Sequence, residues 1–300
     1  MNRPVTSIRR TLAYANWLFN PLYRPQTPSV YELLGRDSPT SQALYLNLGY
    51  WAEAKNLDEA CEALVALVGE TAELDQYGHL VDCGFGFADQ DIYWACRYPG
   101  LSITGLNVTP SQVSHAQQRV RDAGLDDRIN LRLASATAMP LDDASADVVT
   151  ALESAFHFRT RERFFGEAWR VLKPGGRLVT ADILPLNTEQ AGQTGSWGRA
   201  WRLTASRFDI PEANAYTADR YRSILEDMGF VRVSVHSIRN DVYAPLHAAL
   251  RHDPRPLCQL HPLPRAVARL SLIPPADSVF HGMDYVIATA TKPISSGEGA

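Results

Sequence analysis

The sequence is poor in the features that mark nucleic-acid-binding and membrane-spanning proteins. Its 300 residues carry 29 Lys or Arg against 33 Asp or Glu, so the formal net charge is −4. The basic excess that attracts a phosphate backbone is therefore missing. No window of the sequence is long and apolar enough to form a transmembrane helix. We expect neither a nucleic acid partner nor a transmembrane segment.

The four cysteines lack the spacing of a metal site. Cys61, Cys83, Cys96 and Cys258 form no C-x-x-C pair and no Cys/His cluster, so we expect no metal. Scattered thiols in a chain of this length are typical of a reducing compartment. Segment 11–22 is interrupted by asparagines and a proline and lacks a small-residue cleavage site, which is not typical of a signal peptide. We expect a cytoplasmic protein.

Between residues 79 and 183, apolar runs alternate with helical patterns, which is typical of βαβ units and a parallel sheet. The expected strands are Leu80–Cys83, Ser102–Leu106, Ile129–Leu133, Asp147–Leu152 and Arg177–Asp182, with Val231–His236 and Asp284–Thr291 further along the chain. The expected helices are Leu57–Leu67, Ala88–Arg97, Pro110–Ala123, Arg161–Leu172 and Thr217–Met228. Lys173-Pro174-Gly175-Gly176 is expected to end a helix and turn into a strand. The proline-rich stretch Pro245–Pro275 carries no clear pattern. The fold class is α/β.

The run His79-Leu80-Val81-Asp82-Cys83-Gly84-Phe85-Gly86-Phe87-Ala88 is the most informative part of this sheet. An apolar strand ends in a carboxylate, and two glycines then turn the backbone before a helix begins. The dinucleotide fingerprint G-x-G-x-x-G has a different spacing. Asp82 is placed to repel a pyrophosphate but to attract a cation. The motif therefore favours S-adenosylmethionine (SAM), which carries an ammonium and a sulfonium.

Two further groups follow the next strands and are expected to reach the same sheet edge. Gly105-Leu106-Asn107-Val108 ends the second strand, where Asn107 is able to hydrogen-bond ribose hydroxyls. Ala134-Ser135-Ala136-Thr137 follows the third strand, where backbone N–H groups and a hydroxyl suit adenine. Each group alone is weak evidence, because small polar residues follow many strands. Their order and spacing together indicate a SAM site.

With these motifs the chain resembles class I SAM-dependent methyltransferases over residues 45–292, most specifically over 79–185. The stretches Val81–Gln90, Gly105–Gln112, Ser135–Pro140, Leu152–Phe158 and Arg170–Asp182 are similar to small-molecule methyltransferases of natural-product pathways, in particular macrolide O-methyltransferases of the erythromycin type. The resemblance implies a Rossmann-like, mostly parallel seven-stranded sheet of order 3-2-1-4-5-7-6, and homodimers occur in the family. It places Tyr50, Asp82, Gly84, Gly86, Asn107, Val108, Gln112, Ser135, Ala136, Thr137 and Leu152 at the SAM site. Asn107 and Ser135 depart from the superfamily, which often has acidic residues there, and Ala88 departs as well.

Candidate catalytic residues follow the fourth and fifth strands. Methylation of a hydroxyl requires a base, and His157 titrates in the right range and is expected near the methyl group. Asp182 ends the neighbouring strand, where it is placed either to orient His157 or simply to end the strand. Glu153 is interpreted as positioning the cofactor, or as taking the final proton if the acceptor is a terpenyl carbon. His157 has the alternative role of bracing its loop.

The flanking segments are rich in aromatic residues. Residues 1–75 are expected to form an N-terminal helical lid over the carboxyl ends of the strands, because ligands of open α/β sheets bind at that edge. Residues 76–292 form the methyltransferase domain, with a cap insertion at 185–216, and residues 293–300 a loose tail. The proposed substrate pocket consists of Tyr14, Trp17, Trp51, Trp197 and Trp201. Packing alone is the alternative role for Trp51, Trp197 and Trp201.

The sequence favours transfer of a methyl group to a hydroxyl of a largely apolar small molecule. One alternative is C-methylation of a prenyl diphosphate, for which Arg199, Arg202 and Arg207 would supply the cations. N-methylation is another, since amines need less help from a base. A SAM-binding protein without catalysis is the remote alternative. The sequence does not name the acceptor.

Overall fold

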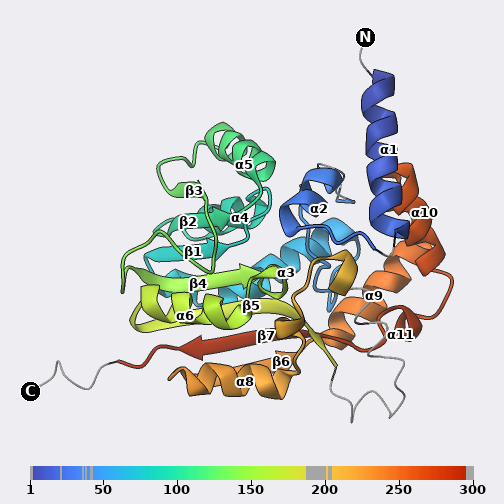
Figure 1. Ribbon diagram of the computed structural model, residues 1–300. Helices are drawn as coiled ribbons and strands as arrows, with labels where there is room; N and C mark the ends of the chain where they lie inside the picture. The colour runs from blue at the N-terminus through green and yellow to red at the C-terminus, as the bar shows by residue number, and fades with distance from the viewer. Residues whose placement is uncertain are drawn as a thin grey trace, which may run out of the picture.

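The computed structural model describes residues 3–20, 22–35, 37, 39–40, 43–186, 201 and 205–294, and of residues 3–7 the backbone alone. Within this part of the chain, seven strands form one sheet in the order β3-β2-β1-β4-β5-β7-β6 (Figure 1). The strands are β1 (His79–Cys83), β2 (Ser102–Asn107), β3 (Ile129–Leu133), β4 (Ala146–Leu152), β5 (Leu172–Pro185), β6 (Val231–Ser237) and β7 (Met283–Thr291). The predicted fold class and strand order are confirmed.

Helices cover both faces of this sheet. The helices of the first face are α3 (Leu57–Thr71), α4 (Asp89–Arg97), α5 (Pro110–Asp122) and α9 (Arg239–His252), and those of the second face are α6 (Arg161–Val171) and α8 (Ala218–Asp227). Alternation along the strands divides the buried side chains between the two cores. Leu80 and Val148 belong to the first core, whereas Val81 and Val149 belong to the second.

Parallel pairing brings the carboxyl ends of three central strands to one edge. β1 lies between β2 and β4, with Asp82 opposite Gly105 of β2 and Thr150 of β4. The loops after β1, β2 and β4 therefore begin side by side, which is where open α/β sheets bind ligands. β7 runs antiparallel between β5 and β6.

Most element boundaries agree with the sequence analysis to within two residues, and β3 agrees at both ends. β5 differs more, since it begins at Leu172 and includes the expected turn 173–176. Its pairing with β4 is irregular there: Leu172 pairs with Ala146, and the regular register resumes with Arg177 opposite Val148. The unassigned stretch 245–275 contains the end of α9, a 3₁₀ turn and α10 (Pro262–Ser271), followed by α11 (Ala276–Val279).

The N-terminal residues do not all lie in one place. α3 is part of the first core of the sheet. In contrast, α1 (Arg3–Phe19) and α2 (Thr27–Leu34) share a small separate core around Tyr14, Trp17 and Val30. α1 lies beside α10 and away from the sheet (Figure 1). Among the described residues, no helix has the length and apolarity needed to cross a bilayer.

Candidate active site

A cavity of about 310 Å³ opens at the carboxyl ends of β1, β2 and β4. This is within the size range of small-molecule sites, about 300–1,000 Å³. The predicted SAM-site residues that line it are Gly84, Gly86, Asn107, Val108, Gln112, Ser135, Ala136, Thr137 and Leu152. Of the predicted catalytic residues, Glu153 and His157 line it too. The structure thus brings together three motifs that are spread over residues 84–137.

The turn after β1 requires glycine at position 84. Gly84 has φ of +95°, which L side chains rarely adopt, and its N–H donates a hydrogen bond of 2.7 Å to the Leu106 carbonyl. A Cβ atom there would lie 2.4 Å from the Cβ of Ser154. Ser154 is fixed in turn, because its hydroxyl donates to the Cys83 carbonyl at 2.5 Å. Bare backbone at Gly84 therefore lets the loop after β4 pack against the loop after β1.

Replacing Gly84 with alanine is expected to destabilise the fold by about 1–3 kcal/mol and to weaken binding of S-adenosylhomocysteine. The reason is the clash with Ser154 combined with the unfavourable φ. Urea unfolding and calorimetry measure the two effects. Gly100→Ala is the matched control, since a Cβ there meets nothing within 4 Å. Equal stability and affinity of the two variants would contradict the assigned role of Gly84.

Asn107 and Gln112 form a polar pair on the cavity wall. Asn107 Nδ2 donates to Gln112 Oε1 at 3.0 Å, and Asn107 Oδ1 accepts from the Thr109 N–H at 3.0 Å. Gln112 Nε2 is buried and has no hydrogen-bond partner among the described residues. A buried donor without a partner costs free energy, so this amide is suited to an acceptor atom of a bound ligand.

Asp82 lies behind the cavity wall and not in it. It is fully buried, accepts hydrogen bonds from Gln90 Nε2 and Thr150 Oγ1 at 2.8 Å each, and is absent from the cavity lining. Burial raises the pKa of its carboxyl group. The expectation of direct contact between Asp82 and a cation is therefore corrected. Gln90, which the sequence analysis missed, lines the cavity and is held by Asp82.

Glu153 connects the loop after β4 to the N-terminal segment. Its Oε1 accepts from the Leu48 N–H and from the Tyr285 hydroxyl, at 2.7 Å each. Burial raises the pKa of Glu153 to about 7, and the two hydrogen bonds oppose this shift. The backbone of Glu153 has φ of +48°, which is uncommon for a residue with a side chain. The carboxyl group is therefore held in place by two donors at the cavity wall.

His157 is paired with a residue that the sequence analysis missed, Tyr31 of α2. The Tyr31 hydroxyl lies 2.9 Å from His157 Nε2, and both side chains line the cavity. Burial lowers the pKa of His157 to about 4, so the imidazole is neutral at pH 7. Burial raises the pKa of Tyr31 above its ordinary value, so the phenol keeps its proton. The neutral imidazole is able to accept a proton from the phenol, and a pKa of about 4 makes it a weak base.

Asp182 does not pair with His157. It is fully buried in an ion pair with Arg161, whose Nε lies 2.8 Å from Asp182 Oδ2. Arg161 also donates to the carbonyls of Ile183 and Asn214 and lies over the rings of Tyr216 and Tyr221. The predicted His157–Asp182 pair is corrected: the carboxylate neutralises a buried guanidinium that no sequence pattern revealed.

The predicted substrate-pocket residues do not line the cavity. Tyr14 and Trp17 lie in the separate α1–α2 core. Trp51 is buried, and its Nε1 donates to the Leu48 carbonyl. Trp201 is also buried and does not line the cavity. Tyr50, expected at the SAM site, is also absent from the lining. These expectations are corrected. Trp197 lies outside the described residues. The lining comes instead from the segment just before Tyr50, Leu44–Asn47, together with Phe158 and residues of α2.

Among the described residues of the cavity wall, acidic side chains outnumber basic ones. Its carboxylates are Asp89, Glu153 and Asp209, and its only Lys or Arg among the described residues is Arg159. Arg159 is ion-paired with Asp209, which also accepts from the Thr27 N–H at 2.7 Å and the Thr27 hydroxyl at 2.9 Å. Asp89 is likewise paired, with Arg119 at 2.5 Å. Among the described residues of the wall, Glu153 is therefore the carboxylate that has no ion-pair partner.

Comparison with known proteins agrees with this geometry. Residues 81–180 match the family model described as a methyltransferase domain. Erythromycin 3''-O-methyltransferase of Saccharopolyspora erythraea is 33% identical over 305 aligned positions, covering 96% of this chain and 97% of that protein. The chain belongs to this methyltransferase family. The resemblance stated from the sequence is confirmed.

Two further comparisons place this methyltransferase more broadly. It is 37% identical to 27-O-demethylrifamycin SV methyltransferase of Amycolatopsis mediterranei over 140 residues, 46% of this chain and 51% of that relative. Among solved structures, the [4+2]-cyclase SpnF superposes with a TM-score of 0.70 at 21% identity, covering 91% of this chain and 98% of that one. The second likeness shows a shared fold only.

Proposed function

We propose that this methyltransferase transfers the methyl group of SAM to a hydroxyl of a largely apolar small molecule of the natural-product type. The observation that carries the proposal is the Tyr31–His157 pair, a neutral base with a hydroxyl partner in the wall of the cavity that contains the SAM motifs. The relatives named above methylate oxygen according to their names. The geometry and the relatives together favour a hydroxyl acceptor.

The residues of the cavity wall fit SAM. Gly84 and Gly86 leave the backbone bare, and Gln112 Nε2 offers an unused donor. Glu153 is a carboxylate of the wall without an ion-pair partner in the described part of the chain, and its ionised form suits a cation. When bound, SAM supplies an electrophilic methyl group on a sulfonium. We assign its contacts to the loops after β1, β2, β3 and β4, with Gln90 added and Asp82 and Tyr50 left out of direct contact.

His157 is the proposed general base and Tyr31 its relay. The acceptor hydroxyl lies next to the Tyr31 oxygen. As the new O–CH₃ bond forms, the acceptor hydroxyl passes its proton to the Tyr31 oxygen. Tyr31 passes its own phenolic proton to His157 Nε2, 2.9 Å away, and so stays neutral. Holding the acceptor in line while water is excluded supplies further acceleration. Glu153 and its two donors position the loop that carries His157.

Replacing Tyr31 with phenylalanine is expected to lower kcat by about 10²–10⁴-fold, as for loss of the base itself, because phenylalanine cannot pass the proton to His157. Binding of S-adenosylhomocysteine should not change, because the SAM motifs are untouched. Tyr93→Phe, on α4 and outside the cavity lining, is the matched control. If Tyr31 and His157 act in one relay, the double variant with His157→Asn should be no slower than His157→Asn alone. Additive losses would contradict the relay.

C-methylation of a prenyl diphosphate has less support from the described residues. Arg207, one of its expected cations, donates to the carbonyls of Trp17 and Asn20 and is absent from the cavity lining. Arg199 and Arg202 lie outside the described residues. The test is turnover with geranyl diphosphate, compared in the wild type and Arg202→Ala. Turnover that the substitution abolishes, while turnover of hydroxyl acceptors remains, would support a second activity.

A panel of acceptors tests the proposed function against the remaining alternatives. Release of S-adenosylhomocysteine is measured with polyketide, glycoside, phenol, amine and terpenoid acceptors. We expect turnover with a hydroxyl acceptor that also has a large apolar surface. Turnover of amines alone would indicate N-methylation, and tight SAM binding without turnover across the panel would indicate a binding protein without catalysis.

A further inference from the structure

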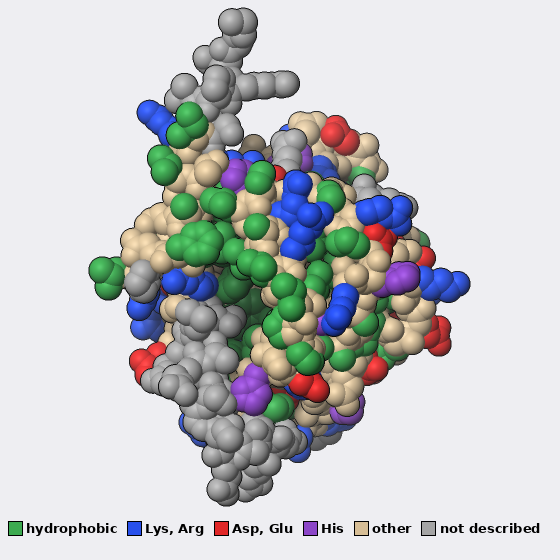
Figure 2. Space-filling view, turned by 90° about the vertical axis from the view of Figure 1, so that its right-hand side faces the viewer, with side chains coloured by type: hydrophobic (Ala, Val, Ile, Leu, Met, Phe, Trp, Pro, Cys, Tyr) green, Lys and Arg blue, Asp and Glu red, His purple; other side chains and the backbone are tan. Residues whose placement is uncertain are grey.

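The exposed large apolar side chains of this protein are concentrated on one pair of helices. Of the twelve found among the described residues, seven lie in segments 8–22 and 267–273, in or just after α1 and α10. They are Ile8, Leu12, Phe19, Leu22, Val267, Leu270 and Ile273. Figure 2, which looks onto this side of the molecule, shows hydrophobic side chains gathered there with Lys or Arg among them. We call the outer surface of α1 and α10 the α1–α10 face.

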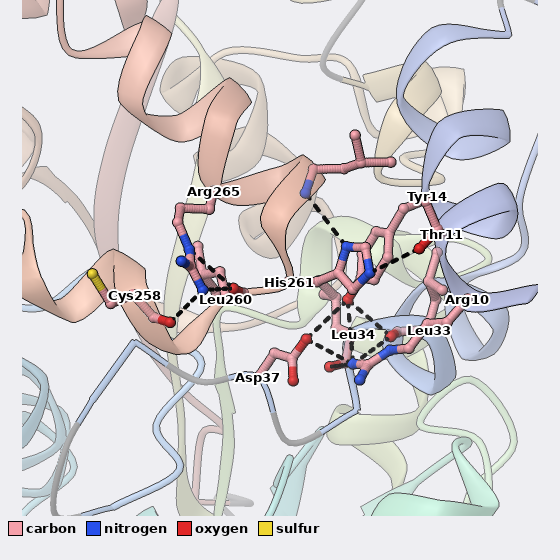
Figure 3. A network of polar contacts seen from close by, with 11 residues as sticks. Arg10, Thr11, Tyr14, Leu33, Leu34, Asp37, Cys258, Leu260, His261 and Arg265 are labelled. Carbon is pink, nitrogen blue, oxygen red and sulfur yellow. Dashed lines mark hydrogen bonds and ion pairs between the residues drawn. The ribbon is translucent and has the colours of Figure 1, made fainter. Parts of the chain in front are cut away.

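The two helices are held together by contacts on their inner sides. The His261 ring stacks on Tyr14 with a centroid distance of 4.5 Å, and His261 Nε2 lies 3.2 Å from the Thr11 hydroxyl (Figure 3). Arg10 joins α1 to the end of α2 through Asp37 and the carbonyl of Leu34. The inner sides therefore have protein partners. Leu12 and Leu270 are 64% and 63% exposed.

The charge of these helices differs from that of the rest of the chain. α1 and α10 contain five arginines, Arg3, Arg9, Arg10, Arg265 and Arg269, and no Asp or Glu. Arg10 is paired with Asp37, and Arg265 donates to the carbonyls of Cys258 and Leu260. Among the described side chains, Arg9 and Arg269 have no ion-pair partner. The chain has 29 basic residues, so 24 remain outside the two helices against 33 acidic ones. The acidic residues nearest α10 in sequence already have partners, since Asp253 pairs with Arg255 and Asp277 lies 3.7 Å from Arg239.

We propose that the α1–α10 face binds an anionic lipid surface. Apolar side chains next to arginines, without acidic residues, are the composition of helices that lie in a membrane interface. The apolar groups would enter the boundary between headgroups and acyl chains, and Arg9 and Arg269 would contact the anionic headgroups. The proposal concerns attachment at a membrane surface, and it does not depend on the methyl-transfer reaction.

A second copy of the chain is a poorer occupant of this face. In a twofold dimer the same patch meets itself. The arginines of one α1–α10 face would then meet those of the other without acidic residues from α1 or α10 to pair with them, which costs affinity. An anionic surface supplies the missing opposite charge. The positive charge of the α1–α10 face therefore favours an anionic lipid surface over a second copy of the chain.

Vesicle flotation tests the proposal with the full-length protein. We expect the protein to float with vesicles of phosphatidylglycerol and phosphatidylcholine, to bind at least tenfold less to phosphatidylcholine alone, and to be released by salt. Leu12→Glu combined with Leu270→Glu should lower binding at least tenfold, and Arg9→Glu combined with Arg269→Glu should do the same. Ile294→Glu is the matched control, because Ile294 is 77% exposed and lies beyond β7.

Calorimetry with S-adenosylhomocysteine shows that each variant is folded. Failure of the wild type to float with anionic vesicles would overturn the proposal. Equal loss of binding in Ile294→Glu would overturn it too, because binding would then not involve this particular face. Light scattering that shows a dimer dissociated by the Leu12 and Leu270 substitutions, without any vesicle binding, would assign the face to a second copy.

Discussion

Replacing His157 with asparagine is expected to lower kcat by about 10²–10⁴-fold, the usual contribution of a general base. Asparagine keeps a polar group in the cavity wall but does not accept a proton at neutral pH. The KM for SAM and the affinity for S-adenosylhomocysteine should change much less than kcat, because the loops after β1, β2 and β3 keep their contacts and only the loop after β4 is altered. Steady-state kinetics with the best hydroxyl acceptor measures the change.

Two variants make this result specific. His236→Asn changes an exposed histidine of β6 and should leave kcat unchanged. Glu153→Gln removes the other titratable group near the reaction centre and retains the volume of the side chain. If His157→Asn kept most of the activity while Glu153→Gln lost it, the base would be Glu153, whose pKa of about 7 lies closer to neutral pH than that of His157. The assignment of His157 would then be wrong.

Replacing Asp182 with alanine is expected to destabilise the fold by about 3–5 kcal/mol. The substitution leaves Arg161 buried with no carboxylate, and both side chains of this pair are 0% exposed. This is a large part of the stability of a typical domain, about 5–15 kcal/mol. The free energy of unfolding in urea measures the loss. Replacing both partners together with apolar residues should cost much less, because no uncompensated charge remains.

The pair Asp147–Lys173 is the matched control for Asp182. Its side chains are 20% and 43% exposed, so water screens the interaction. Asp147→Ala should therefore cost only about 1 kcal/mol. If Asp182→Ala were instead as stable as the wild type and lost activity, the original hypothesis that Asp182 serves His157 would be restored, and the structural role of the Arg161 pair would be contradicted.

The sheet and the SAM motifs were predictable because local signals mark them. Strand β3 begins after the polar residues Asp127 and Arg128 and ends before the small residues 134–136, and its predicted ends agree with the structure. The glycines after β1 and the polar groups after β2 and β3 occur at strand ends, and parallel pairing necessarily brings such ends to one edge. The order of the strands followed from the resemblance. Structure is predicted most reliably where local propensity, hydrophobic pattern and turn residues all favour the same element, as they do at these strand ends.

Contacts between distant segments were not predictable in the same way. Tyr31 reaches His157 across 126 positions of sequence, and nothing in its local pattern separates it from other aromatic residues of the N-terminal segment. Arg161 was interpreted only as the first residue of a helix, although it is fully buried and neutralises Asp182. Trp17 and Trp51 were assigned to the pocket by composition, but their indole N–H groups are satisfied by backbone carbonyls elsewhere. Tertiary packing decided these positions.

The central claim is that the cavity at the ends of β1, β2 and β4 directs the methyl group of SAM to an oxygen. Incubation with SAM carrying a deuterated methyl group and an apolar acceptor with several hydroxyls, followed by mass spectrometry and NMR, tests it most directly. The account predicts one labelled methyl ether per acceptor, formed about 10²–10⁴-fold more slowly by the His157→Asn variant. Label found on carbon or nitrogen, or equal ether formation by that variant, would contradict it.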